Sequence, residues 1–310
     1  MYQRIILIFS IFLSIACIAY GASFTDESGK QFNVQNPYCR IISLYGAHTE
    51  NLFALGLDKE IIGVSSNEAY PPKALTKPVF SYHDDAEKFM AAKPDLVLIR
   101  PMIAASHAQF VEKLEKAAIT VVSLQPVGIS DMYEYWKNLG LLTGRDKEAA
   151  LMTSRFQTAI SRIDTLVQGI SPKNRRQVYF EAIHDKMRTF APDSTAIFVL
   201  TKAGGINIAA DAAQRKNTNI ADYGKEKILS RAKDIDIYLA QNGTMNRITT
   251  DMIKKESGFK VIKAIESDQV YLIDELLVSR PTTRLLKGIF DIGRLLYPQI
   301  FTDTIWQEIR

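Results

Sequence analysis

The residues best suited to bind a ligand are aromatic, imidazole, thioether and guanidinium side chains that follow short apolar segments. Tyrosine faces suit a large flat or apolar ligand, and arginine pairs in a bidentate way with carboxylates and phosphates. A phenolate or an imidazole is also able to ligate iron directly. We therefore predict a ligand-binding set made of Tyr45, Tyr82, His83, Arg100, Met102, His184, Arg188, Arg280 and Arg284.

Some members of this set also have a simpler structural interpretation. Tyr45 could serve in ordinary packing, and Arg280 could be the partner of a structural ion pair. The adjacent pair Tyr82 and His83 is harder to explain by packing, because it lies in a short polar stretch beside two acidic residues. We therefore regard this pair as the most informative part of the set.

No local pattern in the sequence indicates catalysis. The chain has no G-x-S-x-G elbow, H-E-x-x-H helix, phosphate-binding glycine loop or dinucleotide fingerprint. The four histidines are far apart in sequence, without the i,i+4 pair of a metal-binding helix. We expect a binding protein with no cofactor of its own. A receptor for a bare transition-metal ion and an exported hydrolase remain the alternatives.

The elements that must position these residues are short apolar strands alternating with helices. This alternation is typical of α/β lobes with central parallel sheets covered on both faces. Ligands meet the carboxyl ends of the strands in such sheets, which is where the candidate residues fall. The predicted strands are 40–44, 61–64, 95–99, 120–124, 177–183, 235–240 and 269–273, and the final helix is 282–297.

A single long helix is predicted between Arg145 and Gly169. Its apolar residues recur at intervals of three and four, which is one face of a helix; they are Met152, Phe156, Ile160, Ile163 and Val167. A helix of this length spans about 35 Å, the width of a domain. We predict an N-terminal lobe over 23–143, a linking helix over 144–172 and a C-terminal lobe over 173–310.

Composition limits the class of protein further. The 310 residues carry a net charge of +4 without a basic cluster, which argues against nucleic-acid binding. Two cysteines, Cys17 and Cys39, are too few for a disulfide framework, and Cys39 is predicted to be buried. We expect a monomer.

The first 22 residues are predicted to be a signal peptide. Arg4 is their only charge, and the apolar run Ile5–Ile18 is shorter than the ~20 residues that a membrane-spanning helix needs. Export is therefore expected. An alternative is a lipoprotein anchored through Cys17.

Four segments resemble the helix-strut substrate-binding proteins of ABC importers for ferric siderophores, cobalamin and haem. They are IISLYGAHTENLFALG from Ile41, KPDLVLI from Lys93, GGINI from Gly204 and VSRPTTRLLKGIFDIGRLLYP from Val278. The resemblance implies two Rossmann-like lobes joined by one backbone helix, a periplasmic location, and a metal chelate as cargo. It also implies an inner-membrane permease with its ATPase as partner, although a signalling receptor would bind the same cargo.

The resemblance assigns roles to individual residues as well. Glu87, with Glu226 as a substitute on the second lobe, would dock on the permease. Arg284 would point into the cleft from the final helix. Tyr82 or His83 would ligate iron if the cargo is haem. The choice among siderophore, cobamide and haem stays open.

Overall fold

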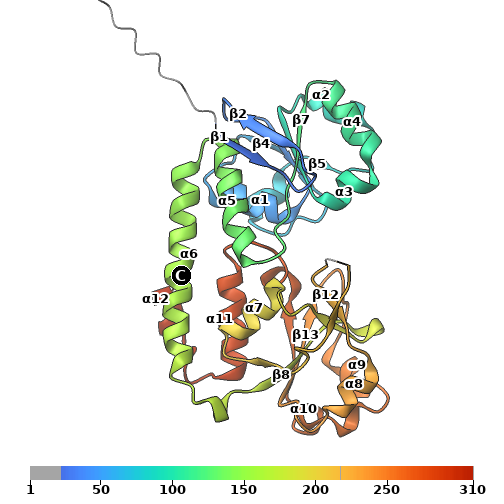
Figure 1. Cartoon of the computed structure of the whole chain (residues 1–310), viewed down its shortest axis with the longest axis vertical. Coiled ribbons are helices and arrows are strands. Elements are labelled where there is room, and N and C mark those ends of the chain that lie inside the picture. The colour runs from blue at the N-terminus through green and yellow to red at the C-terminus, as the bar shows by residue number, and fades with distance from the viewer. Residues whose placement is uncertain (1–21, 217, 310) are drawn as a thin grey trace, which may run out of the picture.

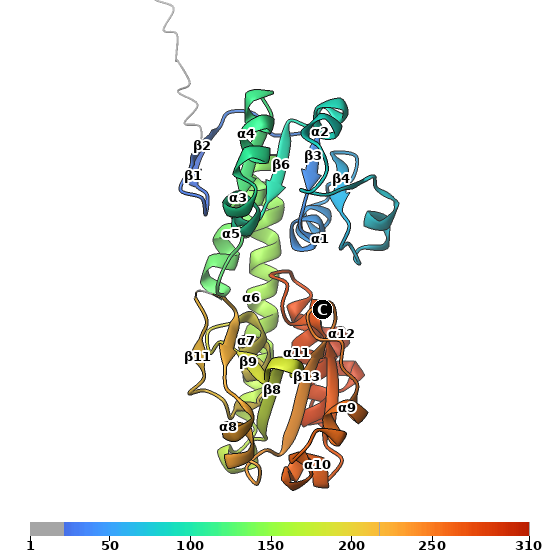
Figure 2. The ribbon, with the colours of Figure 1, turned by 90° about the vertical axis from the view of Figure 1, so that its right-hand side faces the viewer.

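The computed structural model describes residues 22–216 and 218–309. The described chain forms two α/β lobes, stacked along the long axis of the molecule and linked by one helix (Figures 1 and 2). The predicted signal peptide and Cys17 lie outside the described residues, apart from Ala22. The predicted fold class is confirmed.

The N-terminal lobe is built on a parallel sheet in the order β5-β4-β3-β6-β7. Its strands are β3 (Ile41–Ser43), β4 (Ile61–Ser65), β5 (Val79–Phe80), β6 (Leu96–Ile99) and β7 (Thr120–Ser123). Its helices are α1 (Gly46–Ala54), α2 (Ala86–Ala92), α3 (Pro101–Ser106), α4 (Ala108–Lys116) and α5 (Ile129–Thr143), with a 3-10 turn at Pro72–Thr76. Along β6, alternate residues enter different apolar clusters, so the sheet is buried on both faces.

A hairpin not predicted from the sequence precedes this sheet. It consists of β1 (Ala22–Thr25) and β2 (Gln31–Val34), paired antiparallel. The buried Asp26 holds its turn, because one carboxylate oxygen accepts from the backbone N–H groups of Ser28 and Lys30. The other oxygen accepts from the N–H of Ser123 at 2.9 Å, which fixes the hairpin to β7.

The linking helix is α6 (Asp146–Gln168), 23 residues long. The five apolar residues that predicted it are all buried. They belong to one continuous apolar cluster that includes residues of both lobes, and α6 packs on α5, α7, α11 and α12. Figure 1 shows α6 running beside the two lobes. This helix is therefore part of a shared core.

The C-terminal lobe has a mixed sheet in the order β11-β12-β9-β8-β13-β14, with β10 also beside β8. The strands are β8 (Gln177–Ile183), β9 (Arg188–Phe190), β10 (Ile206–Asn207), β11 (Ala213–Gln214), β12 (Ile220–Asp222), β13 (Ile237–Asn242) and β14 (Val270–Asp274). The helices are α7 (Thr195–Lys202), α8 (Lys225–Ser230), α9 (Thr250–Lys255), α10 (Lys263–Glu266), α11 (Leu285–Leu296) and α12 (Asp303–Ile309); short 3-10 turns occupy 172–174, 184–186, 259–261 and 275–277.

One side of this sheet departs from the expected parallel pattern. The strands β8, β13, β14 and β10 are parallel, whereas β9, β12 and β11 are antiparallel to their neighbours. The reversal occurs at Met187, whose φ of 48° is left-handed and turns the chain back on itself. Residues after β8 therefore enter a hairpin, not an open loop at the carboxyl edge.

A loop of the C-terminal lobe forms hydrogen bonds with the N-terminal lobe. We call Ser279–Arg284 the interlobe loop. The carbonyl of Pro281 accepts from Asn51 Nδ2 at 3.0 Å and from Trp136 Nε1 at 3.2 Å. Arg280 donates to the buried Glu50 at 2.7 Å and to the carbonyl of Asn67 at 2.8 Å. The lobes are thus joined by polar contacts in addition to α6.

Cys39 is exposed, so the prediction that it is buried was wrong. It precedes the strand and lies beside Asp95, whose carboxylate accepts from the backbone N–H groups of Cys39 and Arg40. The apolar strand begins only at Ile41. Within residues 22–216 and 218–309, no helix combines the length and apolar character needed to span a bilayer.

Candidate binding cleft between the lobes

A cavity of about 540 Å³ lies between the lobes. Every strand of the N-terminal sheet contributes to it at its carboxyl end, as the rule for open α/β sheets requires. The contributing residues are Tyr45 after β3, Ser66 and Glu68 after β4, Tyr82 after β5, Arg100 after β6 and Gln125 after β7. This cavity is the candidate cleft.

Tyr45 and Arg100 form one part of the N-terminal wall. The guanidinium of Arg100 lies 4.7 Å from the centre of the Tyr45 ring, in a cation–π arrangement. Burial raises the pKa of the Tyr45 phenol, against the opposing charges of Arg100 and Arg280. The Nε of Arg100 is buried without a hydrogen-bond partner among the described residues. This wall therefore holds an unused donor.

Glu68 supplies an unused acceptor on the same wall. Its Oε1 accepts from Ser65 Oγ at 2.6 Å and from Thr49 Oγ1 at 3.1 Å. Its Oε2 is buried with no described partner, and burial raises the pKa of the carboxyl. Sequence reasoning missed this residue. The signal was available, because Glu68 comes three residues after the end of β4.

The C-terminal wall consists of two loops that follow β13 and β14. Gly243, Thr244 and Met245 come after β13, and Asp274, Glu275 and Ser279 come at and after the end of β14. The N–H of Met245 donates to Glu275 at 3.0 Å, so the loops hold each other. A Cβ on Gly243 would lie 2.3 Å from that carboxylate, which explains the glycine. Asn219, before β12, completes the wall.

The cleft as a whole is not basic. Its lining includes the acids Glu68, Asp274 and Glu275 and the bases Arg100 and Arg280. Arg280 is already paired with Glu50, which leaves Arg100 as the cation of the lining without a described ion-pair partner. This charge pattern disfavours a strongly anionic ligand.

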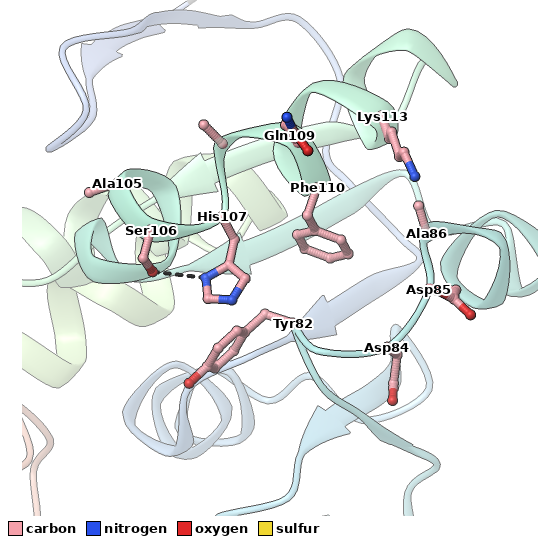
Figure 3. Close-up of a pocket in the computed structure, with 11 residues that line it drawn as sticks. Tyr82, Asp84, Asp85, Ala86, Ala105, Ser106, His107, Gln109, Phe110 and Lys113 are labelled. Atoms are coloured by element: carbon pink, nitrogen blue, oxygen red, sulfur yellow. Dashed lines mark hydrogen bonds between the residues drawn. The ribbon is translucent and has the colours of Figure 1, made fainter.

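Three rings cluster beside the cleft. The Tyr82 ring lies 4.2 Å from His83 and 4.8 Å from His107, centre to centre, and the two histidine rings are 5.2 Å apart. Tyr82 and His107 also line a second cavity of about 490 Å³, the lateral pocket, where Figure 3 shows them facing each other. His107 was not among the predicted site residues, and only the fold brings it here.

The contacts of His107 define its tautomer. Ser106 Oγ donates to the carbonyl of Met102 at 2.6 Å, so this oxygen must accept from His107 Nδ1 at 2.8 Å. His107 Nε2 then carries the lone pair of the neutral ring.

The structure brings four of the predicted residues to the cleft, namely Tyr45, Tyr82, Arg100 and Arg280. Arg280 also forms an ion pair with Glu50, which is the structural role that the sequence analysis gave as its alternative. His83 is exposed and contacts the Tyr82 ring without lining the cleft. Met102 is exposed on α3, outside the lining. Among the described residues, no group of three or more His, Cys, Asp or Glu side chains is arranged to hold a metal ion.

Three other predicted residues are placed away from the cleft lining. His184 is buried, and its Nδ1 donates to Glu181 at 2.9 Å, which raises the pKa of the imidazole. Arg188 lies on β9 and pairs with Asp222 of β12 at 2.9 Å. Arg284 stacks on Tyr70 and contacts Glu50 at 3.4 Å. Each of these side chains contacts a partner whose position could not be predicted from the order of the strands in the sequence.

The two predicted docking acids are exposed and lie in the first turns of their helices. Glu87 is on α2 and Glu226 is on α8. Figure 1 places α2 and α8 on the side of the molecule away from α6, one on each lobe. Their role in docking stays a prediction.

Comparison with known proteins agrees with this arrangement. An uncharacterised ABC transporter substrate-binding lipoprotein of Bacillus subtilis, YvrC, is 25% identical over 92% of this chain and 88% of its own length. A vitamin B12-binding protein of Vibrio cholerae is 24% identical over 82% of this chain and 87% of its own length. The structure of a possible iron-binding periplasmic protein of Staphylococcus epidermidis is 28% identical, with a TM-score of 0.72, over 84% of this chain and all of that one.

The family model described as periplasmic binding protein matches residues 41–277, which is most of the chain and contains both walls of the cleft apart from Ser279 and Arg280. This match confirms the resemblance drawn from the four sequence segments. The chain belongs to the periplasmic binding protein family.

Proposed function

We propose that this protein is the exported substrate-binding protein of an ABC importer and that its cargo is a cobamide. The cargo binds in the interlobe cleft and is delivered to an inner-membrane permease and its ATPase. Support for the transport role comes from the family match and from relatives named as ABC transporter and vitamin B12-binding proteins.

The observation that favours a cobamide is the unpaired donor and acceptor on one wall. Arg100 Nε and Glu68 Oε2 are both buried without partners. Buried polar groups without partners are uncommon, so both side chains keep hydrogen-bonding capacity that a small rearrangement on ligand binding would use. A primary amide offers one acceptor and two donors, which matches this pair. The rim of a cobamide carries several such amides around a flat ring that Tyr45 and Tyr82 would face.

The charge of the cleft supports the same choice. Three acids and two arginines line it, and one of these arginines is already paired. A trianionic catecholate complex or the two carboxylates of haem would meet repulsion from Glu68, Asp274 and Glu275. A complex whose rim is mostly neutral amide avoids that cost.

Haem is the second candidate, because Tyr82 offers a phenol beside the imidazole of His107. A phenolate is an established ligand of haem iron. The basic partners that haem carboxylates need are scarce in the cleft lining, which places haem behind the cobamide.

The test is calorimetric titration of the purified protein with cyanocobalamin, haemin and a ferric trihydroxamate. We expect saturable one-to-one binding of cyanocobalamin in the micromolar range or tighter, about −8 kcal/mol or more favourable, and no saturation by the other two. Binding of haemin with a Soret shift, and none of cyanocobalamin, would replace the cobamide by haem. Failure of all three would reject both proposed cargoes.

A further inference from the structure

The C-terminal wall of the cleft is connected to a buried carboxylate. Glu181 of β8 is fully buried. Its Oε2 accepts from His184 Nδ1 at 2.9 Å and from the hydroxyl of Tyr238, and its Oε1 accepts from Asn246 Nδ2 at 3.4 Å. Buried side-chain oxygens without partners are costly, so these three donors are what allow the Glu181 side chain to be buried in the core.

Asn246 connects the buried Glu181 to a loop that lines the cleft. Its Nδ2 also donates to the carbonyl of Gln241 at 2.9 Å, and its Oδ1 accepts from the N–H of His184 at 2.9 Å. The carbonyl of Asn246 accepts from the N–H of Gly243 at 3.1 Å and closes a turn. Thr244 and Met245 are the middle residues of that turn, and both line the cleft.

Gln241 makes a second connection. Its Nε2 donates to the carbonyl of Ala182 at 2.9 Å, and its Oε1 accepts from Ser279 Oγ at 3.0 Å. Ser279 also lines the cleft. Three cleft-lining residues on two loops are therefore fixed through β8 and β13, although no side chain of Glu181, Gln241 or Asn246 lines the cleft.

We infer that Glu181, Gln241 and Asn246 are positioning residues that hold the C-terminal wall in the shape that receives the cargo. This inference rests on the proposed binding of cargo in the cleft. It gives His184, which the sequence suggested as a direct contact, an indirect role as a donor to Glu181. Preformed walls raise affinity, because less order is lost when the ligand binds.

The experiment compares Asn246→Ala and Glu181→Gln with the wild-type protein by two measurements. The first is amide hydrogen exchange of residues 243–247, which requires no cargo. The second is the dissociation rate of cyanocobalamin. We expect Asn246→Ala to speed exchange in this turn at least tenfold and to speed dissociation at least fivefold. Glu181→Gln, which keeps the side-chain length, should have a smaller effect in the same direction.

The matched control is Thr143→Val. Thr143 is a buried polar residue of α5, in the N-terminal lobe and outside the network, and its hydroxyl donates to the carbonyl of Leu139 at 2.7 Å. Its replacement should lower stability without changing exchange at 243–247. Unchanged exchange and dissociation in folded Asn246→Ala would overturn the inference, as would equal acceleration in the control.

The two proposals fail in different ways. If the wild-type protein binds no cyanocobalamin, the cobamide is rejected while hydrogen exchange still reports whether Glu181 and Asn246 order the turn. If cyanocobalamin binds and the turn exchanges slowly in every variant, the proposal of a cobamide cargo is retained and the positioning role is rejected. Should Glu181→Gln not fold, Asn246→Ala carries the test.

Discussion

Among single residues, Tyr82 lies where the cleft meets the lateral pocket, and its ring lines both. We expect Tyr82→Ala to weaken cargo binding at least tenfold, about 1.4 kcal/mol, because a ring facing the ligand is lost. Calorimetric titration measures this change. The control is Met102→Ala, an exposed position outside the cleft lining, which should bind normally. Equal affinity in Tyr82→Ala would remove this ring from the site.

His48 gives the protein a pH-dependent stability. Its Nε2 donates to the carbonyl of Ile99 at 3.1 Å, and Nδ1 accepts from the hydroxyl of Tyr135 at 2.7 Å. Burial lowers the pKa of the imidazole from 6.5 to about 3. Between those values the unfolded chain binds a proton that the native protein does not, so stability falls as the pH falls.

The corresponding prediction concerns the slope of stability with pH. The free energy of unfolding, measured in urea, should decrease as the pH drops below 6.5 toward 3. His48→Gln keeps a donor and an acceptor but does not titrate, so its decrease should be shallower, even if the variant is less stable at neutral pH. Parallel curves for the two proteins would show that His48 does not contribute.

At the scale of elements, the interlobe loop makes structural contacts through residues that were predicted to bind the ligand. Its Arg280 and Arg284 both contact Glu50 of the N-terminal lobe. Glu50 is buried and faces Arg280 at 2.7 Å and Arg284 at 3.4 Å. Gly46 leaves room for this pair, since a Cβ there would lie 2.3 Å from the Arg280 guanidinium. The start of α1 is therefore shaped around a side chain from the other lobe.

We expect Arg280→Ala to destabilise the protein by about 3 kcal/mol, because it leaves a buried carboxylate with one longer contact. Arg284→Ala is the matched comparison and should cost clearly less, since Glu50 keeps its shorter partner. Urea unfolding of both variants measures the difference. Equal losses would mean that the two arginines share Glu50 evenly.

The sequence predicts elements better than it predicts side-chain directions. Helix α6 follows from the regular spacing of its apolar residues, and Tyr45, Tyr82 and Arg100 follow from the ends of strands. His184 and Arg284 could not be placed this way, because Glu181 and Tyr70, which engage them, are not recognisable as partners from local sequence. The ring cluster at His107 likewise depends on contact between loops distant in sequence.

For the molecule as a whole, a shared core and the interlobe loop oppose wide opening. Helix α6 has no Gly or Pro between Asp146 and Gln168, and it is buried against both lobes. We expect the radius of gyration from solution scattering to change by about 1 Å or less on adding cargo. A change of several ångströms would contradict a rigid link.

Docking belongs to the same scale. Reversing the charge with Glu87→Lys should leave cargo affinity intact and abolish uptake in cells, because the acid is exposed and does not line the cleft. Glu112→Lys, another exposed acid, on α4, is the control and should support normal uptake. Normal uptake with Glu87→Lys would place the permease contact elsewhere on the lobe.

The hydrogen bond between the Trp136 indole and the Pro281 carbonyl has a practical consequence. It joins an intrinsic fluorophore of one lobe to the backbone of the other, so any parting of the lobes exchanges that carbonyl for water and shifts the emission to longer wavelength. With Trp306 replaced by Phe, a single indole would remain. The emission of Trp136 would therefore report hinge movement in dilute solution, without an attached dye.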